Sequence, residues 1–233
     1  MFTGATCSPD EIRGPPHRTA RLAPDFARCA GSIRATRFVL LRGSVTLRGM
    51  QRPVLIVVDM LRDFLDRWPA HARETLVQST NELVAMMRSR GNPIIWVRQE
   101  FEPDLSDAFP EMRANNTRVT IKGTPGCQIV PELQVAASDI VLVKKRYSAF
   151  FGTDLDRMLH ELKPDPIIIA GINTHSCVRM TAIDAYQRDL PVVLARECVG
   201  SYEAEHHAIT LRYLQGKIAK LMSNTEIRAN MAN

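Results

Sequence analysis

Three residues with reactive side chains come at or just after predicted strands in separate parts of the chain. Asp59 ends the first predicted strand, Lys144 follows the third, and Cys177 follows the fourth. In open parallel α/β sheets, ligands bind outside the carboxyl ends of the strands, so these side chains are expected to meet there. An ammonium favours the reactive thiolate, and a carboxylate can move protons to and from a leaving amine. The set therefore predicts acyl transfer at a carbonyl carbon.

Each of these residues also has an ordinary structural interpretation. A lone cysteine is commonly a small buried hydrophobe, an aspartate after a strand commonly forms a turn or cap, and a lysine there is commonly solvated. Their joint placement gives the chemical interpretation about the same support as the structural one. The helix predicted at 176–188 strengthens the chemical interpretation, because Cys177 then lies in a first turn whose free amides favour a thiolate and can hold an oxyanion.

The elements that must position this set alternate along the chain. Short apolar runs that alternate with amphipathic helices predict an α/β fold, with a three-layer α-β-α arrangement and a six-stranded, mostly parallel sheet. No GxGxxG motif follows the first strand, and no Walker loop is present, so two common nucleotide-binding patterns are missing. The predicted strands are 53–59, 93–97, 139–143, 166–170, 191–195 and a weaker 220–222. The predicted helices are 71–90, 155–162, 176–188 and 204–214.

Residues 1–49 differ in composition from the rest of the chain. They contain eight arginines and three acidic residues, a net charge of +5, whereas residues 50–233 contain 22 basic and 22 acidic residues. We predict that 1–49 is a basic, disordered extension or results from a start codon assigned too early, with a targeting peptide as the alternative. The folded domain is then predicted at 50–233. The neutral domain indicates no nucleic-acid partner, and no apolar run is long enough to span a membrane.

The cysteines and histidines give little support for a disulfide framework or a metal site. The five cysteines are scattered, odd in number and without a CxxC pair, which favours a reducing cytoplasm. His206 and His207 are the leading metal candidates, but adjacent residues on a helix diverge by about 100°, so we expect a solvated helix face. We predict no metal and no other cofactor. The cysteines are Cys7, Cys29, Cys127, Cys177 and Cys198.

Four stretches give the region from about Met50 onward a resemblance to the isochorismatase-like cysteine hydrolase superfamily. "VLIVVDMLRDF" resembles the opening strand with its catalytic aspartate, here Asp59. "KKRYSAFFGTDLD" resembles the K-x-R-Y-S-A-F segment, which makes Lys144 the catalytic lysine, and "GINTHSCVRMTAIDAYQRD" resembles the segment that contains the nucleophile, Cys177. "GTPGCQIVPEL" at 123–133 resembles the loop before the third strand.

The resemblance implies further features. It implies a six-stranded parallel sheet, a cis peptide bond between Ile172 and Asn173, and an oxyanion hole formed by the amides of Asn173 and Cys177. It also implies a homodimer or homotetramer.

Differences among members of the family narrow the predicted reaction. True isochorismatases generally lack the cysteine, so Cys177 favours hydrolysis of a C–N bond in a small amide, carbamoyl or ureido compound, through a thioester. Metal-dependent nicotinamidases have histidines after the second strand, whereas "WVRQEFEPDLSDAFPEM" has none. The alternatives are an isochorismatase-type vinyl ether hydrolase and a non-catalytic member that acts as an interaction module.

The candidate substrate-binding residues come from several segments. Arg98 can hold a substrate carboxylate, and a surface salt bridge is the alternative role for it. The aromatic candidates can form the wall of a pocket, but they can equally belong to the core. The candidates are Phe64, Arg98, Gln99, Tyr147, Phe151 and Thr174.

Overall fold

The computed structural model describes residues 49–231, and the extension predicted at 1–49 lies almost entirely outside this range. Its central element is a six-stranded sheet in the order β3-β2-β1-β4-β5-β6, and all neighbouring strands are parallel. The predicted three-layer α/β fold is confirmed, with an entirely parallel sheet. The strands are β1 (Val54–Val58), β2 (Ile94–Gln99), β3 (Ile140–Lys144), β4 (Ile167–Gly171), β5 (Val192–Val199) and β6 (Lys220–Met222).

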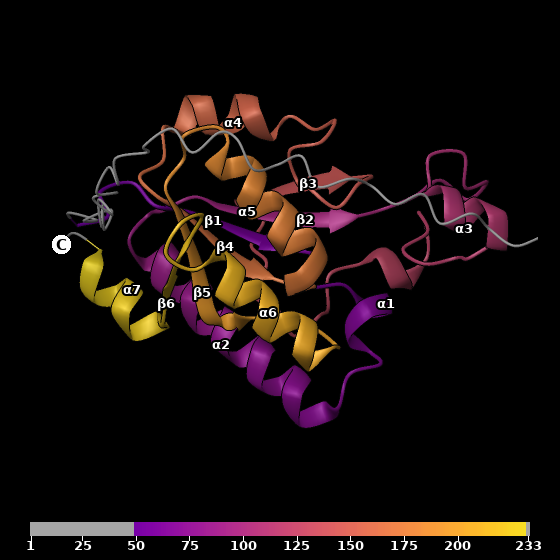
Figure 1. The fold of residues 1–233 in the computed structure, drawn as a ribbon, viewed down its shortest axis with the longest axis horizontal. Helices are drawn as coiled ribbons and strands as arrows, with labels where there is room; N and C mark the ends of the chain where they lie inside the picture. The colour runs from indigo at the N-terminus through magenta and orange to yellow at the C-terminus, as the bar shows by residue number, and fades with distance from the viewer. Residues whose placement is uncertain (1–48, 232–233) are drawn as a thin grey trace, which may run out of the picture. The chain divides into compact units, whose positions relative to one another are not determined.

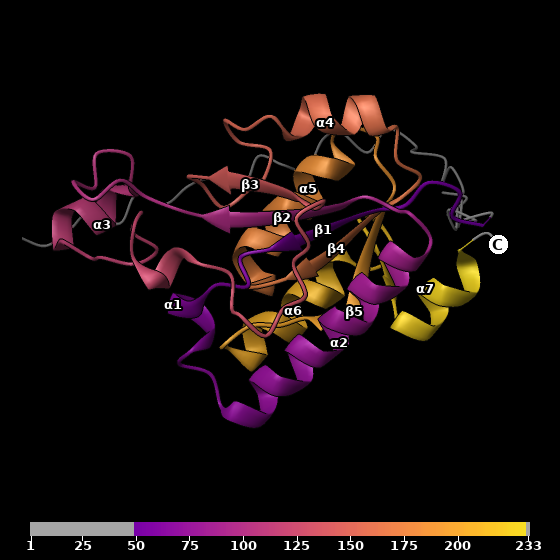
Figure 2. The same ribbon diagram turned by 180° about the vertical axis from the view of Figure 1, so that it is seen from behind.

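Helices cover both faces of the sheet (Figures 1 and 2). On β1, Leu55 and Val57 pack with α2 and α7 on one face, while Val54, Ile56 and Val58 pack with α4, α5 and α6 on the other. This alternation follows the two-residue period of a strand, and burial on both faces explains why the strands are almost wholly apolar. The α-helices are α1 (Arg62–Leu65), α2 (Ala70–Ser89), α3 (Pro110–Asn115), α4 (Leu155–Leu162), α5 (Arg179–Tyr186), α6 (Ala204–Leu214) and α7 (Asn224–Asn230).

A segment after β2 extends beyond the carboxyl ends of the strands (Figure 1). It includes α3 and a small core of its own, formed by Phe101, Leu105, Ala108 and Ile121. A 3-10 turn at Pro125–Cys127 follows and returns the chain toward α1, with which it is in contact. The segment therefore adds a wall on the side of the sheet where Asp59 and Lys144 lie.

The strand order changes direction between β1 and β4. β1 leads outward through β2 to β3, whereas β4 leads the other way through β5 to β6. Ligands in open α/β sheets bind at such a switch point, outside the carboxyl ends of the strands. Asp59 directly follows β1, and Cys177 follows β4 by six residues, so both lie at this point.

Two strands are longer than the sequence predicts. β2 continues to Gln99, and β5 continues to Val199 past the charged pair Arg196–Glu197, both of which are exposed. The register of β5 against β4 shifts between Ile169 and Gly171, which indicates a bulge. The bulge places Val199 beside Gly171 and brings Gly200 next to the turn that contains Cys177.

Within the described range, no helix is long and apolar enough to cross a membrane. Cys127, Cys177 and Cys198 are free thiols. Cys7 and Cys29 lie outside the described residues.

Candidate active site

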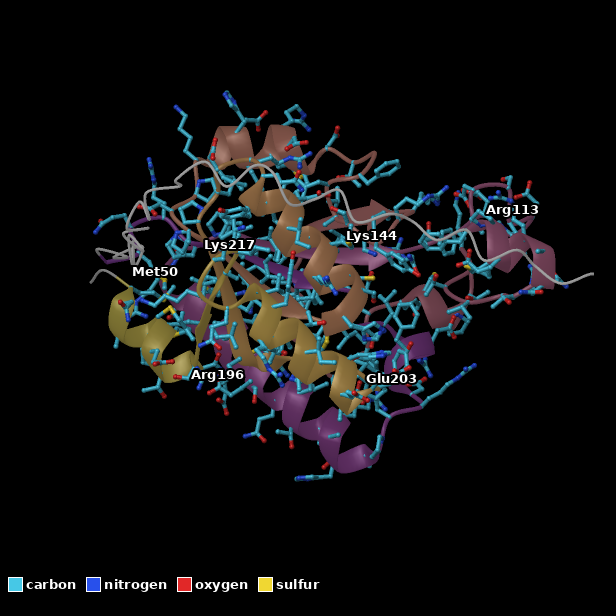
Figure 3. The ribbon with its side chains drawn as sticks, in the orientation of Figure 1. Met50, Arg113, Lys144, Arg196, Glu203 and Lys217 are labelled. Carbon is cyan, nitrogen blue, oxygen red and sulfur yellow. The ribbon has the colours of Figure 1, made fainter. Side chains whose placement is uncertain are left out.

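A buried ammonium joins the carboxylate and the thiol. Lys144 Nζ lies 2.6 Å from Asp59 Oδ2, donates to Cys177 Sγ at 3.5 Å, and donates to the Arg146 carbonyl at 2.9 Å. The ammonium therefore makes two hydrogen bonds and one buried ion pair. Lys144, labelled in Figure 3, lies near the carboxyl ends of β2 and β3. The structure thus brings together the three residues that the sequence placed at separate strand ends.

Asp59 is held in an uncommon backbone conformation. Its φ is +52°, in the left-handed region, which is uncommon for a residue other than glycine. The Asp59 amide donates to the Val97 carbonyl at 2.8 Å, and Asp59 Oδ1 accepts from the Gln99 amide at 2.8 Å. Strained residues of this kind cluster at functional sites. β2 therefore fixes Asp59 from both its backbone and its side chain.

The turn that contains Cys177 begins at a glycine whose position leaves no room for a side chain. Gly171 has a φ of +111°, and an added Cβ would lie 2.0 Å from the Val58 carbonyl oxygen. The peptide bond between Ile172 and Asn173 is cis. A π-helical turn, Thr174–Val178, follows in place of the first turn of the single helix predicted at 176–188. Such turns are frequent at functional sites.

Hydrogen bonds hold this turn on two sides. Thr174 donates to the Gly200 carbonyl through both its amide and its hydroxyl, each at 2.8 Å. On the other side, the Thr181 hydroxyl donates to the Cys177 carbonyl at 2.7 Å. The amide of Asn173 has no backbone acceptor among residues 49–231. This amide is therefore free to donate to a ligand, as the predicted oxyanion hole requires.

The electrostatics of the thiol differ from the sequence prediction. Burial, and then the negative charge of Asp59, raise the pKa of the Cys177 thiol to about 12, although Lys144 opposes the shift. The sequence predicts that the ammonium and the helix amides favour the thiolate, but burial and the Asp59 charge outweigh them here, and neither effect on the sulfur can be read from the sequence. Burial also disfavours the charged form of Lys144, but Asp59 and Cys177 outweigh it and raise the lysine pKa. The resting site is a thiol beside a carboxylate–ammonium pair.

A cleft of about 890 Å³ opens above the sulfur. Phe64, Gln99 and Tyr147 line it as predicted, and Asn173 and Cys177 lie in the same lining. Gln99 is buried, and neither its Nε2 atom nor Asn173 Oδ1 has a hydrogen-bond partner in the described structure. Buried polar atoms are nearly always paired, so a free donor and a free acceptor beside a thiol indicate a place for a polar ligand.

Three predicted pocket residues do not line the cleft. Because β2 continues to Gln99, strand alternation places Arg98 on the opposite face, where it pairs with Glu100 at 2.8 Å. Phe151 is 64% exposed, since the neighbouring Phe150 takes the core position. Thr174 is fully buried, and its hydroxyl is bound inside the protein. These three assignments are corrected by the structure.

The two adjacent histidines of α6 have different surroundings. His206 is exposed and pairs with Glu203, as expected of a solvated face. His207 is only partly exposed, and its Nδ1 lies 2.9 Å from Thr174 Oγ1, so the prediction is wrong for this residue. No sequence pattern signals this contact, which joins residues 33 positions apart.

The described part of the chain contains no group of three or more histidine, cysteine or acidic side chains placed to hold a metal ion. One similar solved structure, a pyrazinamidase of Pyrococcus horikoshii, is described as a complex with zinc. It is 28% identical, with a TM-score of 0.64, over 74% of this chain and 99% of that one.

Two further relatives cover most of the described chain. The phenazine biosynthesis protein PhzD of Pseudomonas fluorescens is 29% identical over 184 residues, which are 76% of this chain and 85% of PhzD. The N-carbamoylsarcosine amidase of Thermoplasma acidophilum is 28% identical, with a TM-score of 0.64, over 75% of this chain and 98% of that one.

The family assignment rests on a match that spans most of the domain. A family model described as the isochorismatase domain matches residues 53–226, a span that contains the aspartate, the lysine and the cysteine at the switch point. The chain therefore belongs to the isochorismatase family of hydrolases.

Proposed function

We propose that this protein hydrolyses the C–N bond of a small amide or carbamoyl compound, with Cys177 as the nucleophile. The observation that carries this proposal is the bridge that Lys144 Nζ makes between Asp59 and Cys177 at the cleft. A base, a nucleophile and a fixed positive charge in contact are what a covalent acyl transfer needs. The similarity to an N-carbamoylsarcosine amidase supports the same class of substrate.

The first half of the reaction forms the thioester. Asp59 takes the thiol proton while Cys177 Sγ forms a bond to the substrate carbonyl carbon. Lys144 keeps its proton, because its raised pKa holds the ammonium, and it stabilises the developing thiolate. The amides of Asn173 and Cys177 hold the oxyanion. The C–N bond then breaks, and Asp59 gives its proton to the departing nitrogen, which leaves as ammonia or an amine.

The second half releases the product. Water loses a proton to Asp59 and attacks the thioester carbon, the C–S bond breaks, and the sulfur leaves as a thiolate that regains the proton from Asp59. The raised thiol pKa suits this scheme, because proton removal is then coupled to attack rather than completed beforehand. It also makes a resting site that reacts slowly with other electrophiles.

The unpaired polar atoms of the cleft favour a substrate with a free amide group. Asn173 Oδ1 can accept from an N–H of the substrate, while Gln99 Nε2 can donate to one of its oxygens. A primary carboxamide or a terminal ureido group carries both functions. We therefore expect unsubstituted amides to be hydrolysed faster than their N-methylated forms.

The test is ammonia release from a panel of N-carbamoyl amino acids, biuret, ureidoacrylate analogues and nicotinamide, with isochorismate as a separate arm. Release that resists a chelator and disappears in Cys177→Ala supports the proposal. Cleavage of isochorismate without ammonia release from any amide would replace it with vinyl ether hydrolysis. No turnover of any compound by folded protein would favour the interaction module.

A second variant tests the role assigned to Gln99. Gln99→Leu removes the donor and should raise KM about fivefold, since a hydrogen bond contributes about 1 kcal/mol and 1.4 kcal/mol is a factor of ten. Gln78→Leu is the matched control, because Gln78 lies on α2 and bonds to Glu82. An unchanged KM in Gln99→Leu would remove Gln99 from the site.

A further inference from the structure

His207 on α6 is connected to the turn that contains the nucleophile through one buried hydroxyl. Thr174 Oγ1 lies 2.8 Å from the Gly200 carbonyl and 2.9 Å from His207 Nδ1. A carbonyl has no proton to give, so the single hydroxyl proton of Thr174 points to Gly200. The second contact must then use a proton on His207 Nδ1. This assigns the Nδ1–H form to His207.

The surroundings of His207 keep this donor in place. Burial lowers the pKa of His207, so the imidazole is neutral near neutral pH. The neighbouring His206 pairs with Glu203, and the His206 ring lies 5.3 Å from the His175 ring. His206 thus meets the turn only through the ring of His175, whereas His207 supplies the hydrogen-bond donor that Thr174 needs.

The contact has a consequence for the geometry of the site. Thr174 is the first residue of the π-helical turn, follows Asn173 directly, and lies one turn before Cys177. Its amide and hydroxyl both bind the Gly200 carbonyl, and the Gly200 amide donates to the Gly171 carbonyl at 3.2 Å. The chain of bonds from His207 through Thr174 and Gly200 thus returns to the start of the turn.

We propose that His207 is a positioning residue, which holds the turn bearing Asn173 and Cys177 through Nδ1–H···Oγ1 of Thr174. The inference rests on the proposed function for its effect on rate, but the bond itself can be tested without a substrate. The effect is indirect, since His207 does not line the cleft. Small misplacements of reacting groups reduce rate strongly, by as much as about 100-fold for 1 Å.

Matched variants separate the donor from the bulk of the side chain. His207→Asn places an amide N–H where Nδ1–H lies, whereas His207→Leu has a similar size and no donor. Thr174→Ser keeps the hydroxyl and Thr174→Val removes it. Glu205→Ala, on the same helix and exposed, controls for changes in the helix itself.

The first measurement is amide hydrogen exchange in residues 172–178 of the full-length protein. We expect His207→Leu and Thr174→Val to speed exchange about tenfold, the factor that corresponds to 1.4 kcal/mol, while His207→Asn and Glu205→Ala stay near the native rate. Unchanged exchange in His207→Leu would overturn the proposal, whatever the substrate is.

The second measurement uses the amide of the panel that native protein hydrolyses fastest. His207→Leu should lower kcat about 10- to 100-fold with little change in KM, and His207→Asn should restore most of it. The double variant Thr174→Val/His207→Leu should be no slower than either single variant, since all remove one connection. Equal losses in the leucine and asparagine variants would overturn a role for the donor. Absence of hydrolysis by native protein would refute the proposed function, and hydrogen exchange would still decide the role of His207.

Discussion

Replacing Asp59 with asparagine should make the thiol more reactive and the enzyme inactive. In the native site, the negative charge of Asp59 opposes ionisation of Cys177. Oδ2 and Sγ both contact Lys144 Nζ, at 2.6 and 3.5 Å, so they lie no more than about 6 Å apart. Two unit charges at about 6 Å repel by about 2.8 kcal/mol at an effective dielectric constant of about 20, which is about two pKa units.

The change in thiol pKa has two opposing effects on alkylation. A pKa that falls by about two units from about 12 raises the thiolate fraction at pH 8 about 100-fold. The thiolate is also less nucleophilic, by about eightfold for two units. Alkylation of Cys177 by iodoacetamide should therefore be about tenfold faster in Asp59→Asn than in native protein, while ammonia release is lost.

The assay is the rate of carbamidomethylation of the peptide containing Cys177, followed by mass spectrometry at pH 8. Circular dichroism must show that the variant is folded, because removal of one partner of a buried ion pair costs about 3–5 kcal/mol. Asp156→Asn is the control, since Asp156 pairs with Arg188 at the surface. Slower alkylation in Asp59→Asn would refute the assignment of Asp59 as the charge that holds the thiol protonated.

Three other substitutions give distinct outcomes. Lys144→Met removes the ammonium that favours the thiolate, so Cys177 should be alkylated more slowly than in native protein and ammonia release should fall at least about 100-fold. Gly171→Ala should lower the free energy of unfolding by at least about 2 kcal/mol, measured in urea, because Cβ would meet the Val58 carbonyl in a left-handed conformation. Arg98→Met should leave kcat/KM unchanged, since Arg98 pairs with Glu100 away from the cleft. A large rise in KM would show that Arg98 binds the substrate after all.

That the reactive residues meet could be predicted from the sequence, because the carboxyl ends of parallel strands lie at one edge of the sheet. Asp59 and Lys144 are adjacent to short apolar runs, and the order of the chain alone determines that their strands end on the same side. The error for Arg98 arose at a boundary. The predicted strand ended at Val97 and left Arg98 and Gln99 in a loop. The strand in fact continues to Gln99, and strand alternation then places these two side chains on opposite faces of the sheet.

Other features depended on information that a single sequence lacks. The thiol pKa reflects complete burial and the Asp59 charge, which composition does not reveal. The contact of His207 with Thr174 joins α6 to the turn after β4, and it depends on how these distant segments pack. In contrast, α7 had a readable signal that was missed, because Ser223 and Glu226 form a capping box at its start.

Some expectations drawn from the sequence and from the resemblance stay predictions. They include a homodimer or homotetramer, a cytoplasmic location, the domain start at Met50, and hydrolysis without a metal. Each has a direct measurement, and the chelator arm of the substrate panel tests the last.

The measurement that tests the central claim most directly is capture of the thioester by hydroxylamine. Attack of hydroxylamine on the acyl carbon breaks the C–S bond and gives a hydroxamate, or a hydroxyurea from a carbamoyl substrate, with the thiol regenerated. We expect this product alongside ammonia in native protein, and neither product in Cys177→Ala. Hydrolysis that yields ammonia at the native rate in Cys177→Ala, with no hydroxamate from either protein, would contradict it.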